Sequence, residues 1–219
     1  MTPLYHDFAN ETVLVFGGGS VGTRKALGFA DDARIVVVSP TFDDRLRASG
    51  ANTAQIDLVR AAPDPSATVE WIDRLSPALV VAATDDRAVN ASAEAAALDA
   101  GVLVNRTDVA GGRAAGSVVV PATIEDGAVS VAISTGGTSP ALSKALRERI
   151  EAEIAGAGAM AELSGDLRSE LSERGVPPEA RRDAIRRVVR SEGVWKGLQK
   201  GRSNGEKEAY TVIEEVVDR

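Results

Sequence analysis

The first half of this chain contains a series of short apolar runs, each separated from the next by a stretch of helical character, and no other feature limits the possible folds as much. The runs lie at 12–16, 34–38, 54–59, 78–82 and 101–105. Continuous apolar runs of this length are typical of parallel strands that helices cover on both faces. The third run alternates more and is expected near a sheet edge. The pattern predicts an α/β fold with a Rossmann-type parallel sheet and helices that include 21–30 and 87–100.

After residue 105 the pattern changes. Residues 106–116 are rich in glycine and irregular. The next two apolar runs, 117–120 and 128–133, lie on either side of the turn signal Asp126-Gly127. Two such runs with a turn between them predict a two-stranded antiparallel ribbon. A lone ribbon is marginal in water, so we expect it to pack on another element, with a partner subunit the leading candidate. From Ser139 onward helices are predicted at 139–155, 159–174, 177–191 and 206–218. We therefore predict three parts: a sheet domain at 1–113, a ribbon with the start of a long helix at 114–150, and a helical domain at 151–219.

The composition excludes several classes of chemistry. Lys and Arg number 25 against 32 Asp and Glu, a net charge of −7, so a sequence-independent grip on nucleic acid or on an anionic membrane is not expected. The chain has no cysteine, which excludes disulfides, thiolate catalysis and cysteine-held metal. His6 is its one histidine, so multi-histidine metal sites are excluded too, and we expect no metal. No apolar stretch is long enough for a membrane span and the N-terminus does not resemble a signal peptide, so a cytoplasmic location is expected.

The segment Gly17-Gly18-Gly19-Ser20-Val21-Gly22 satisfies the G-x-G-x-x-G pattern between a predicted strand and a predicted helix. In a dinucleotide-binding turn, the first glycine permits the tight turn, the second lets a diphosphate approach the backbone, and the third lets the helix pack close to the sheet. The N–H groups at the helix N-terminus then face the anion. Because the context is right, we interpret the segment as a dinucleotide site rather than a glycine-rich turn without a ligand.

The second predicted strand ends at the position that reads the adenosine ribose in such domains. That position holds Ser39 rather than an acid. A serine hydroxyl can bond the ribose but does not by itself reject a 2′-phosphate. Asp43 and Asp44 lie just beyond it with Arg45 as the nearest base, so the residues favour NAD over NADP.

Two further polar positions follow strands. Thr84 and Asp85 come after the fourth strand, where they could cap the next helix, contact the cofactor, or do both. Asp108 follows the fifth strand, where a carboxylate beside a nicotinamide could act as a general base. From position alone, an ordinary solvent-exposed loop aspartate is the better interpretation of Asp108.

A second glycine-rich segment, Ser134-Thr135-Gly136-Gly137-Thr138-Ser139, leads into a helix that Ser139 is expected to cap and that Pro140 fits in its first turn. Hydroxyl groups, glycines and a helix N-terminus together can bind an anion, and Lys144, Arg147 and Arg149 follow on the helix. The alternative is a well-formed helix start with no ligand.

Together these segments resemble the precorrin-2 dehydrogenase family, also known as the N-terminal module of siroheme synthases. The likeness lies in 13–27 (VLVFGGGSVGTRKAL), 80–90 (VVAATDDRAVN), 104–108 (VNRTD) and 117–151, which includes STGGTSP. It covers residues 1 to about 155 well, the helical tail only loosely, and the methyltransferase-type domain of the fused enzymes is absent. Thr135 stands where the fused enzymes place a serine.

The resemblance implies a homodimer that oxidises precorrin-2 to sirohydrochlorin by passing a hydride to NAD. It implies that Asp108 is the catalytic aspartate, contrary to what position alone favours. The cofactor contacts that it implies, together with the glycine turn, are Gly17, Gly19, Ser20, Val21, Gly22, Ser39, Pro40, Thr41, Thr84 and Asp85. The substrate contacts that it implies are Ser134, Thr135, Gly136, Gly137, Thr138 and Ser139. Because precorrin-2 is rimmed with carboxylates, an acidic protein must gather cations to hold it, and the cations available are Arg106, Arg113, Lys144 and Arg147.

Three alternatives remain open on the sequence. Some members of the family also insert iron into sirohydrochlorin, which here would require a carboxylate to take up the protons. The chain could instead be an oxidoreductase with another substrate. It could also be a non-catalytic NAD-binding regulatory module, although such modules usually carry an acid where Ser39 stands and lack the segment that ends at Ser139.

Overall fold

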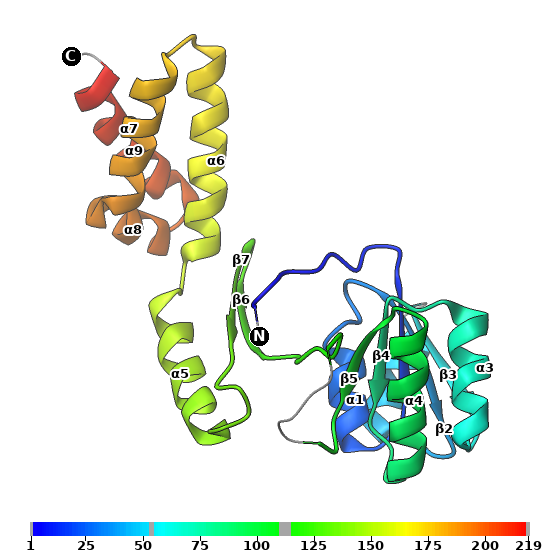
Figure 1. Cartoon of the computed structure of the whole chain (residues 1–219). Helices are drawn as coiled ribbons and strands as arrows, with labels where there is room; N and C mark the ends of the chain where they lie inside the picture. The colour runs from blue at the N-terminus through cyan, green and yellow to red at the C-terminus, as the bar shows by residue number, and fades with distance from the viewer. Residues whose placement is uncertain (1, 53–54, 110–114, 218–219) are drawn as a thin grey trace. The chain divides into compact units, whose positions relative to one another are not determined.

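The computed structural model describes residues 2–52, 55–109 and 115–217, which form two compact units, 1–120 and 121–219 (Figure 1). The first unit contains a five-stranded parallel sheet in the order β3-β2-β1-β4-β5. Its strands are β1 (Thr12–Phe16), β2 (Arg34–Ser39), β3 (Ile56–Arg60), β4 (Leu79–Ala82) and β5 (Leu103–Arg106). Its helices are α1 (Ser20–Leu27), α2 (Asp44–Asn52), α3 (Pro65–Leu75) and α4 (Arg87–Asp99). The predicted Rossmann-type parallel sheet is therefore confirmed.

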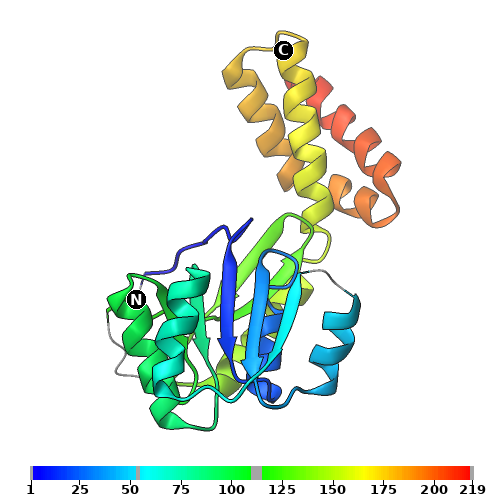
Figure 2. The same cartoon turned by 90° about the vertical axis from the view of Figure 1, so that its right-hand side faces the viewer.

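Alternate residues of the central strand β1 enter two separate cores. Val13 and Val15 pack with Ala26 of α1 and Leu46 of α2 on one face of the sheet. Leu14 and Phe16 pack on the other face, with Ile72 of α3 and with two alanines of α4. Figure 2 shows the sheet between these two helical layers. All four of these β1 residues are fully buried, which explains why the sequence shows a continuous apolar run instead of an alternating one.

The residues of the second unit that the structure describes form a two-stranded antiparallel ribbon and five helices. The ribbon is formed by β6 (Ala122–Asp126) and β7 (Val129–Ile133). The helices are α5 (Pro140–Glu153), α6 (Ala157–Glu173), α7 (Pro178–Arg190), α8 (Glu192–Gln199) and α9 (Arg202–Val217). Helices α6 to α9 enclose their own apolar core, which includes Leu163, Leu167, Val188 and Ile213. This core explains how the C-terminal helices can form a compact bundle.

One strand of the ribbon is not where the sequence analysis placed it. The first ribbon strand is β6, not 117–120, and residues predicted as a turn, among them Ile124, pair with β7. Ser117 instead forms an isolated parallel bridge with Val104 of β5, and the Val118 N–H donates to the Val104 carbonyl at 2.8 Å. The run 117–120 was misassigned because its valines favour extended structure, which fits a sheet edge as well as a ribbon. The turn itself lies at Gly127, with a φ of 56°.

The C-terminal helices also differ in detail from the prediction. Helix α8 was not predicted, and the last helix begins at Arg202 instead of Glu206. Gly197 and Gly205 lie where α8 and α9 approach each other closely. A Cβ atom on Gly197 would lie 2.9 Å from the Asn204 carbonyl oxygen, so glycine is used here for close helix packing.

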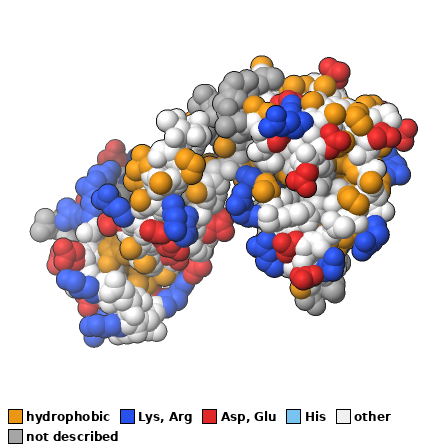
Figure 3. Space-filling view, turned by 90° about the horizontal axis from the view of Figure 1, so that it is seen from below, with side chains coloured by type: hydrophobic (Ala, Val, Ile, Leu, Met, Phe, Trp, Pro, Cys, Tyr) orange, Lys and Arg blue, Asp and Glu red, His pale blue; other side chains and the backbone are white. Residues whose placement is uncertain are grey.

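In the view of Figure 3, Lys and Arg side chains lie beside Asp and Glu side chains over both units. Among the residues that the structure describes, no helix combines the length and the apolar character that crossing a membrane requires.

Candidate functional site

The glycine turn after β1 is shaped by contacts that exclude side chains at three of its positions, and two of these, Gly17 and Gly22, fix how the turn meets the sheet and the helix. Gly17 has a φ of 110°, and a Cβ atom there would lie 2.3 Å from the Ala83 carbonyl oxygen. A Cβ atom on Gly22 would lie 1.9 Å from the Gly17 carbonyl oxygen. Helix α1 therefore starts directly against the turn and close to the sheet, as a dinucleotide-binding turn requires.

Gly19 differs from these two glycines, because a Cβ atom on it would meet nothing within 4 Å. Gly19 is the N-cap residue of α1, and no side chain caps this helix. The first helical hydrogen bond runs from the Thr23 N–H to the Gly19 carbonyl. The backbone N–H groups of the first turn, at Ser20, Val21 and Gly22, are thus placed for an anionic ligand in front of an open surface. These features fit the diphosphate of a dinucleotide.

The end of β2 lies against the same turn. A Cβ atom on Gly18 would lie 2.4 Å from the Thr41 carbonyl oxygen and 3.0 Å from the Ser39 Cβ. Ser39 is 4% exposed, whereas Pro40 and Thr41 are exposed. Beside them Arg45 is held by Asp43, with both nitrogen–oxygen pairs at 3.0 Å. The predicted ribose-reading residues therefore do lie next to the predicted diphosphate turn.

The turn after β4 is organised by Asn90, a fully buried residue of α4. Its Oδ1 accepts hydrogen bonds from the Thr84 N–H at 3.0 Å and from the Thr84 hydroxyl at 2.8 Å. Its Nδ2 donates to the Thr84 carbonyl at 2.9 Å. The helix cap is Asp86, which accepts from the Ala88 N–H at 2.7 Å, so neither Thr84 nor Asp85 caps α4. Asp85 is exposed at the same sheet edge.

Asp108 lies two residues beyond β5 and is held by Arg106, the last residue of that strand. Arg106 donates from Nε at 2.8 Å and from a terminal nitrogen at 3.1 Å to the two carboxylate oxygens of Asp108. Its other terminal nitrogen donates to Glu94 of α4 at 3.0 Å. Between them, Thr107 is fixed to the sheet through two hydrogen bonds to the Ala82 carbonyl.

These contacts decide the ionisation of Asp108. The hydrogen bonds from the Arg106 guanidinium lower the pKa of the Asp108 carboxyl below its usual value, and the Asn90 side chain adds a smaller contribution in the same direction. Partial burial opposes this shift. Asp108 is thus a carboxylate at neutral pH, and its side chain is only 17% exposed. The interpretation as an ordinary solvent-exposed loop aspartate was wrong.

The structure brings most of the predicted site together at one sheet edge. Because β2, β1, β4 and β5 are neighbouring parallel strands, the segments that follow them lie side by side at their carboxyl ends. These segments are residues 39–41 after β2, the glycine turn after β1, residues 84–85 after β4 and Asp108 after β5. Arg113 lies outside the residues that the structure describes. Sequence reasoning did not single out Asn90 and Glu94, although a spacing of four residues on one helix places them on a common face.

Arg106 has different partners from those expected. It was predicted to bind substrate carboxylates, but in the structure it binds two carboxylates of its own chain and is 16% exposed. With Asp108 and Glu94 it forms a cluster whose net charge is −1. Contact between Arg106 and the substrate stays a prediction, and in the structure both sides of its guanidinium are occupied by these two carboxylates.

The second glycine-rich segment, 134–139, belongs to the other unit and is organised by the Thr135 hydroxyl. That hydroxyl donates to the Ser139 carbonyl at 3.1 Å, accepts from the Ser139 N–H at 3.3 Å and lies 3.0 Å from the Ser143 hydroxyl. The Ser139 side chain caps α5 by accepting from the Leu142 N–H at 3.3 Å, which confirms the predicted cap. Gly136 and Gly137 have φ values of 62° and 81°. Lys144 is 76% exposed and lies 3.9 Å from Glu148.

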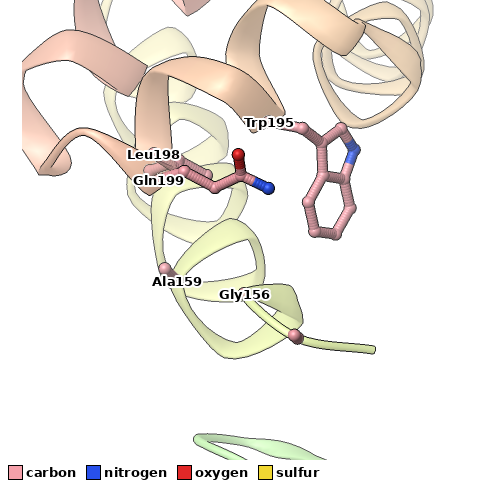
Figure 4. A pocket seen from close by; sticks show the side chains of 6 residues that line it. Gly156, Ala159, Trp195, Leu198 and Gln199 are labelled. Atoms are coloured by element: carbon pink, nitrogen blue, oxygen red, sulfur yellow. The ribbon is translucent and has the colours of Figure 1, made fainter. Parts of the chain in front are cut away.

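The second unit also has a small apolar hollow between α6 and α8 (Figure 4). It is lined by Ala155, Gly156, Ala159, Trp195, Leu198 and Gln199. Trp195 fixes its indole ring by donating from Nε1 to the Val189 carbonyl at 2.9 Å.

The described part of the chain contains no group of three or more His, Asp or Glu residues that could hold a metal ion.

A parallel sheet with this glycine turn defines a dinucleotide-binding protein of the Rossmann class. A family model of NAD(P)-binding domains matches residues 4–122, and a model of the central region of sirohaem biosynthesis proteins matches residues 126–153. The first match covers more than half of the chain.

The chain is 33% identical over 213 residues to a precorrin-2 dehydrogenase of Methanosarcina barkeri, covering 96% of this chain and 92% of that protein. It is 36% identical over 202 residues to siroheme synthase 1 of Aeromonas salmonicida, covering 91% of this chain but only 41% of the longer relative. The solved structure of SirC, a precorrin-2 dehydrogenase, has the same fold, with a TM-score of 0.70 at 24% identity over 98% of this chain and all of SirC. The chain belongs to the precorrin-2 dehydrogenase family.

Proposed function

We propose that this protein is an NAD-dependent dehydrogenase that converts precorrin-2 to sirohydrochlorin in siroheme biosynthesis. The observation that carries the proposal is the match along nearly the whole length of a precorrin-2 dehydrogenase, in a chain whose glycine turn and aspartate lie at one sheet edge. The fused siroheme synthases are longer than this chain, so their other activities are not part of the proposal.

The first unit holds the cofactor. The first-turn N–H groups of α1 receive the diphosphate in front of Gly19, and Ser39 with Pro40 and Thr41 receives the adenosine ribose. The turn at Thr84, fixed by Asn90, faces the remainder of the dinucleotide. When bound, NAD supplies the acceptor for the hydride that the substrate loses.

The chain then supplies the charge and the proton acceptor. Precorrin-2 loses one hydrogen as a hydride, with its electron pair, and a second as a proton, so one proton is released for each NADH formed. Loss of the hydride leaves positive charge on the macrocycle, and the Asp108 carboxylate stabilises it. The same carboxylate can accept the proton or pass it to water.

The segment 134–139 and the cations near it are proposed to receive the acidic side chains of the tetrapyrrole. Ser134, Gly136, Gly137 and Thr138 are exposed, and the N-terminus of α5 offers backbone N–H groups beside them. Lys144 is highly exposed, so its ammonium is available to a ligand carboxylate. Arg113, which lies outside the described residues, is proposed for the same role from its sequence alone.

Turnover of precorrin-2 tests the function directly. The protein, NAD and freshly prepared precorrin-2 should give NADH absorbance together with the sirohydrochlorin spectrum, and Asp108→Ala should bind NAD as before while losing most of the turnover. Asp64→Ala is the matched control, since Asp64 caps α3 by accepting from the Ser66 and Ala67 N–H groups. NAD binding without turnover of precorrin-2 would contradict the proposal. Equal rates for Asp108→Ala and the unaltered protein would remove Asp108 from the reaction.

We propose further that the protein is a cytoplasmic homodimer, formed through the ribbon and α5. No residue of α5 is buried in the single chain, although the helix carries apolar residues, and Leu142 is 50% exposed. One face of the ribbon, with Thr123 and Glu125 of β6, is exposed as well. A second copy would cover these surfaces.

The mass in solution tests the dimer. Light scattering coupled to gel filtration should give twice the chain mass of 22.7 kDa. Leu142→Asp should shift the protein toward the single-chain mass, whereas Val69→Asp should not, although Val69 of α3 is also a partly exposed apolar residue at 43%. A single-chain mass for the unaltered protein would contradict the dimer but not the dehydrogenase.

A further inference from the structure

Asp108 is one end of a chain of three charged side chains, which come from the end of β5, the loop after it and α4. Arg106 at the end of β5 binds both oxygens of Asp108 with one side of its guanidinium, at 2.8 and 3.1 Å. The remaining terminal nitrogen binds Glu94 from the second turn of α4, at 3.0 Å. The three side chains are only 16 to 22% exposed. Hydrogen bonds between charged groups that are this shielded from water are stronger and more directional than surface ion pairs.

We infer that Arg106 and Glu94 are positioning residues, which together hold Asp108 as an oriented anion without neutralising the site. This inference rests on the proposed dehydrogenase function. Neither residue needs to touch the substrate for this role, because both act through Asp108.

The charges of the cluster explain why two residues are needed. An arginine paired with an aspartate fixes the carboxylate in one orientation but leaves the pair neutral. A neutral pair stabilises a developing cation weakly. Glu94 adds a second negative charge on the far side of the guanidinium, so the cluster keeps a net charge of −1 while Asp108 stays oriented. That charge favours the positive macrocycle left by hydride loss over the neutral one before it, which is the condition for lowering the barrier.

The elements that carry the cluster make it rigid. Arg106 pairs with Ala82 in the β4–β5 register, and Thr107 binds the Ala82 carbonyl, so the chain between Arg106 and Asp108 is fixed to the sheet. Asn90 lies one turn before Glu94 on α4 and fixes the Thr84 turn through three hydrogen bonds. The same helix thus fixes the turn that faces the cofactor and the arginine that holds the carboxylate. A preorganised anion of this kind needs little rearrangement during the reaction.

The groups that face Asp108 predict the direction of its titration in each variant. In the described part of the chain these are the Arg106 guanidinium from β5 and the neutral Asn90 amide from α4, and Glu94 of α4 binds the other terminal nitrogen of that guanidinium. Removing the positive charge of Arg106 raises the pKa of Asp108 toward or above its usual value. Removing the negative charge of Glu94 lowers the pKa of Asp108 further. Opposite shifts are not expected from two substitutions that merely loosen the structure.

The experiment uses Arg106→Met, Arg106→Lys and Glu94→Gln, with Arg34→Met as the matched control because the Arg34–Asp57 pair is exposed and lies on other strands. Two quantities are measured for each: the pH profile of kcat/KM with precorrin-2, and the titration of Asp108 by NMR of protein labelled at the aspartate carboxyl carbon. The Asp108 signal is assigned from an Asp108→Asn sample. NAD affinity is measured alongside by calorimetry.

In Arg106→Met, the Asp108 titration and the acidic limb of the profile should move to higher pH by roughly 1–3 units. In Glu94→Gln, the titration should move to lower pH while kcat falls at every pH. Arg106→Lys keeps the positive charge but not the two parallel hydrogen bonds. In this variant Asp108 should still titrate at low pH, yet turnover should fall. NAD affinity should change by less than about twofold in all of them, and the control should match the unaltered protein.

An Asp108 titration that is the same in Arg106→Met and in the unaltered protein would overturn the inference. So would shifts in the same direction for Arg106→Met and Glu94→Gln, or full turnover in Glu94→Gln. If the unaltered protein binds NAD but does not oxidise precorrin-2, the proposed function fails instead, and the NMR titrations still decide whether the cluster holds Asp108 as an anion.

Discussion

A Cβ atom on Gly22 would lie 1.9 Å from the carbonyl oxygen of Gly17, at the place where the first helix meets the turn after the first strand. Gly19, three residues earlier, has open space on the corresponding side, since nothing lies within 4 Å of a Cβ atom there. Its φ of −75° is one that any residue adopts. The two glycines of one motif are thus needed for different reasons. The fold requires glycine at position 22, whereas at position 19 the requirement comes from the ligand.

Substituting each of these glycines by alanine should separate the two requirements. Gly22→Ala pushes a methyl group into backbone, so it should lower the free energy of unfolding by about 3 kcal/mol or more. Gly19→Ala should leave the unfolding free energy within about 0.5 kcal/mol but weaken NAD binding by at least about tenfold, because the methyl group occupies the approach of the diphosphate. Chemical denaturation and calorimetric titration with NAD measure the two effects.

Gly165→Ala in α6 is the control for this pair, because a Cβ atom there also meets nothing within 4 Å and the position is helical. It should raise the unfolding free energy by roughly 0.5–1 kcal/mol through helix propensity and leave NAD affinity unchanged. Unchanged NAD affinity in Gly19→Ala would show that the diphosphate does not approach this residue.

The central strands of the sheet were predictable because burial on both faces leaves a strong trace in the sequence. The run 12–16 matches β1 residue for residue, since each of its apolar residues enters one of the two cores. The glycine turn and the cap at Ser139 were predictable for a related reason, as each depends on local chemistry over a few residues. The positions at the carboxyl ends of the strands then followed from the parallel topology.

What was not predictable depends on contacts between distant segments. The valines at 117–120 favour extended structure whichever strand they pair with. Only the bridge of Ser117 to Val104 decides which sheet they join. The partners of Arg106 could not be inferred from its spacing, because Glu94 lies twelve residues earlier on another element. An asparagine inside an alanine-rich helix was a signal for Asn90, since asparagine is a poor helix former and needs another reason to be there.

Asn90 should be important for both stability and cofactor binding. It is fully buried and makes three hydrogen bonds to Thr84, so Asn90→Ala removes these partners from the Thr84 N–H and carbonyl, while the Thr84 hydroxyl keeps its bond to the Asp86 carbonyl. We expect the unfolding free energy to fall by about 2–4 kcal/mol. NAD affinity should fall as well, because the Thr84 turn loses its fixed position beside the cofactor.

Asn204→Ala is the matched control, as the Asn204 side chain makes one exposed hydrogen bond to the Lys200 carbonyl. It should change the unfolding free energy by no more than about 0.5 kcal/mol. Both variants are compared by denaturant unfolding and by calorimetry with NAD. Equal stability of the two variants would mean that water replaces the Asn90 amide in the turn.

The Thr135 hydroxyl should matter more than the methyl group beside it. The hydroxyl makes all three contacts that organise the segment 134–139, to Ser139 and to Ser143. Thr135→Ser keeps these contacts and should leave kcat/KM for precorrin-2 within about twofold, whereas Thr135→Val removes them at nearly constant volume. We expect Thr135→Val to raise KM for the tetrapyrrole and leave NAD affinity unchanged, measured by steady-state kinetics and calorimetry. A loss of activity in Thr135→Ser would point to a packing role for the methyl group.

A base that the sequence did not suggest, Arg60, contacts the segment predicted to read the ribose. Arg60 ends β3 opposite Ser39 in the register, and its guanidinium donates to the Pro40 carbonyl at 3.1 Å and lies 5.8 Å from the centre of the Phe42 ring. Arg45, which the sequence suggested, is held by both oxygens of Asp43. Arg60 is thus available for a 2′-phosphate next to a serine that does not reject one.

The affinities for the two cofactors should therefore respond differently to one substitution. Arg60→Met keeps an unbranched apolar side chain at this position and removes the charge, so NADP binding should weaken by about tenfold, or 1.4 kcal/mol, while NAD binding changes by less than about twofold. Calorimetric titration of each cofactor measures this, and the difference should shrink at high salt because charge–charge attraction is screened. Arg47→Met, which removes an exposed charge from α2, should change neither affinity. A parallel loss of both affinities in Arg60→Met would mean that Arg60 supports the shape of the segment 39–42, through its bond to Pro40, instead of reading the ribose.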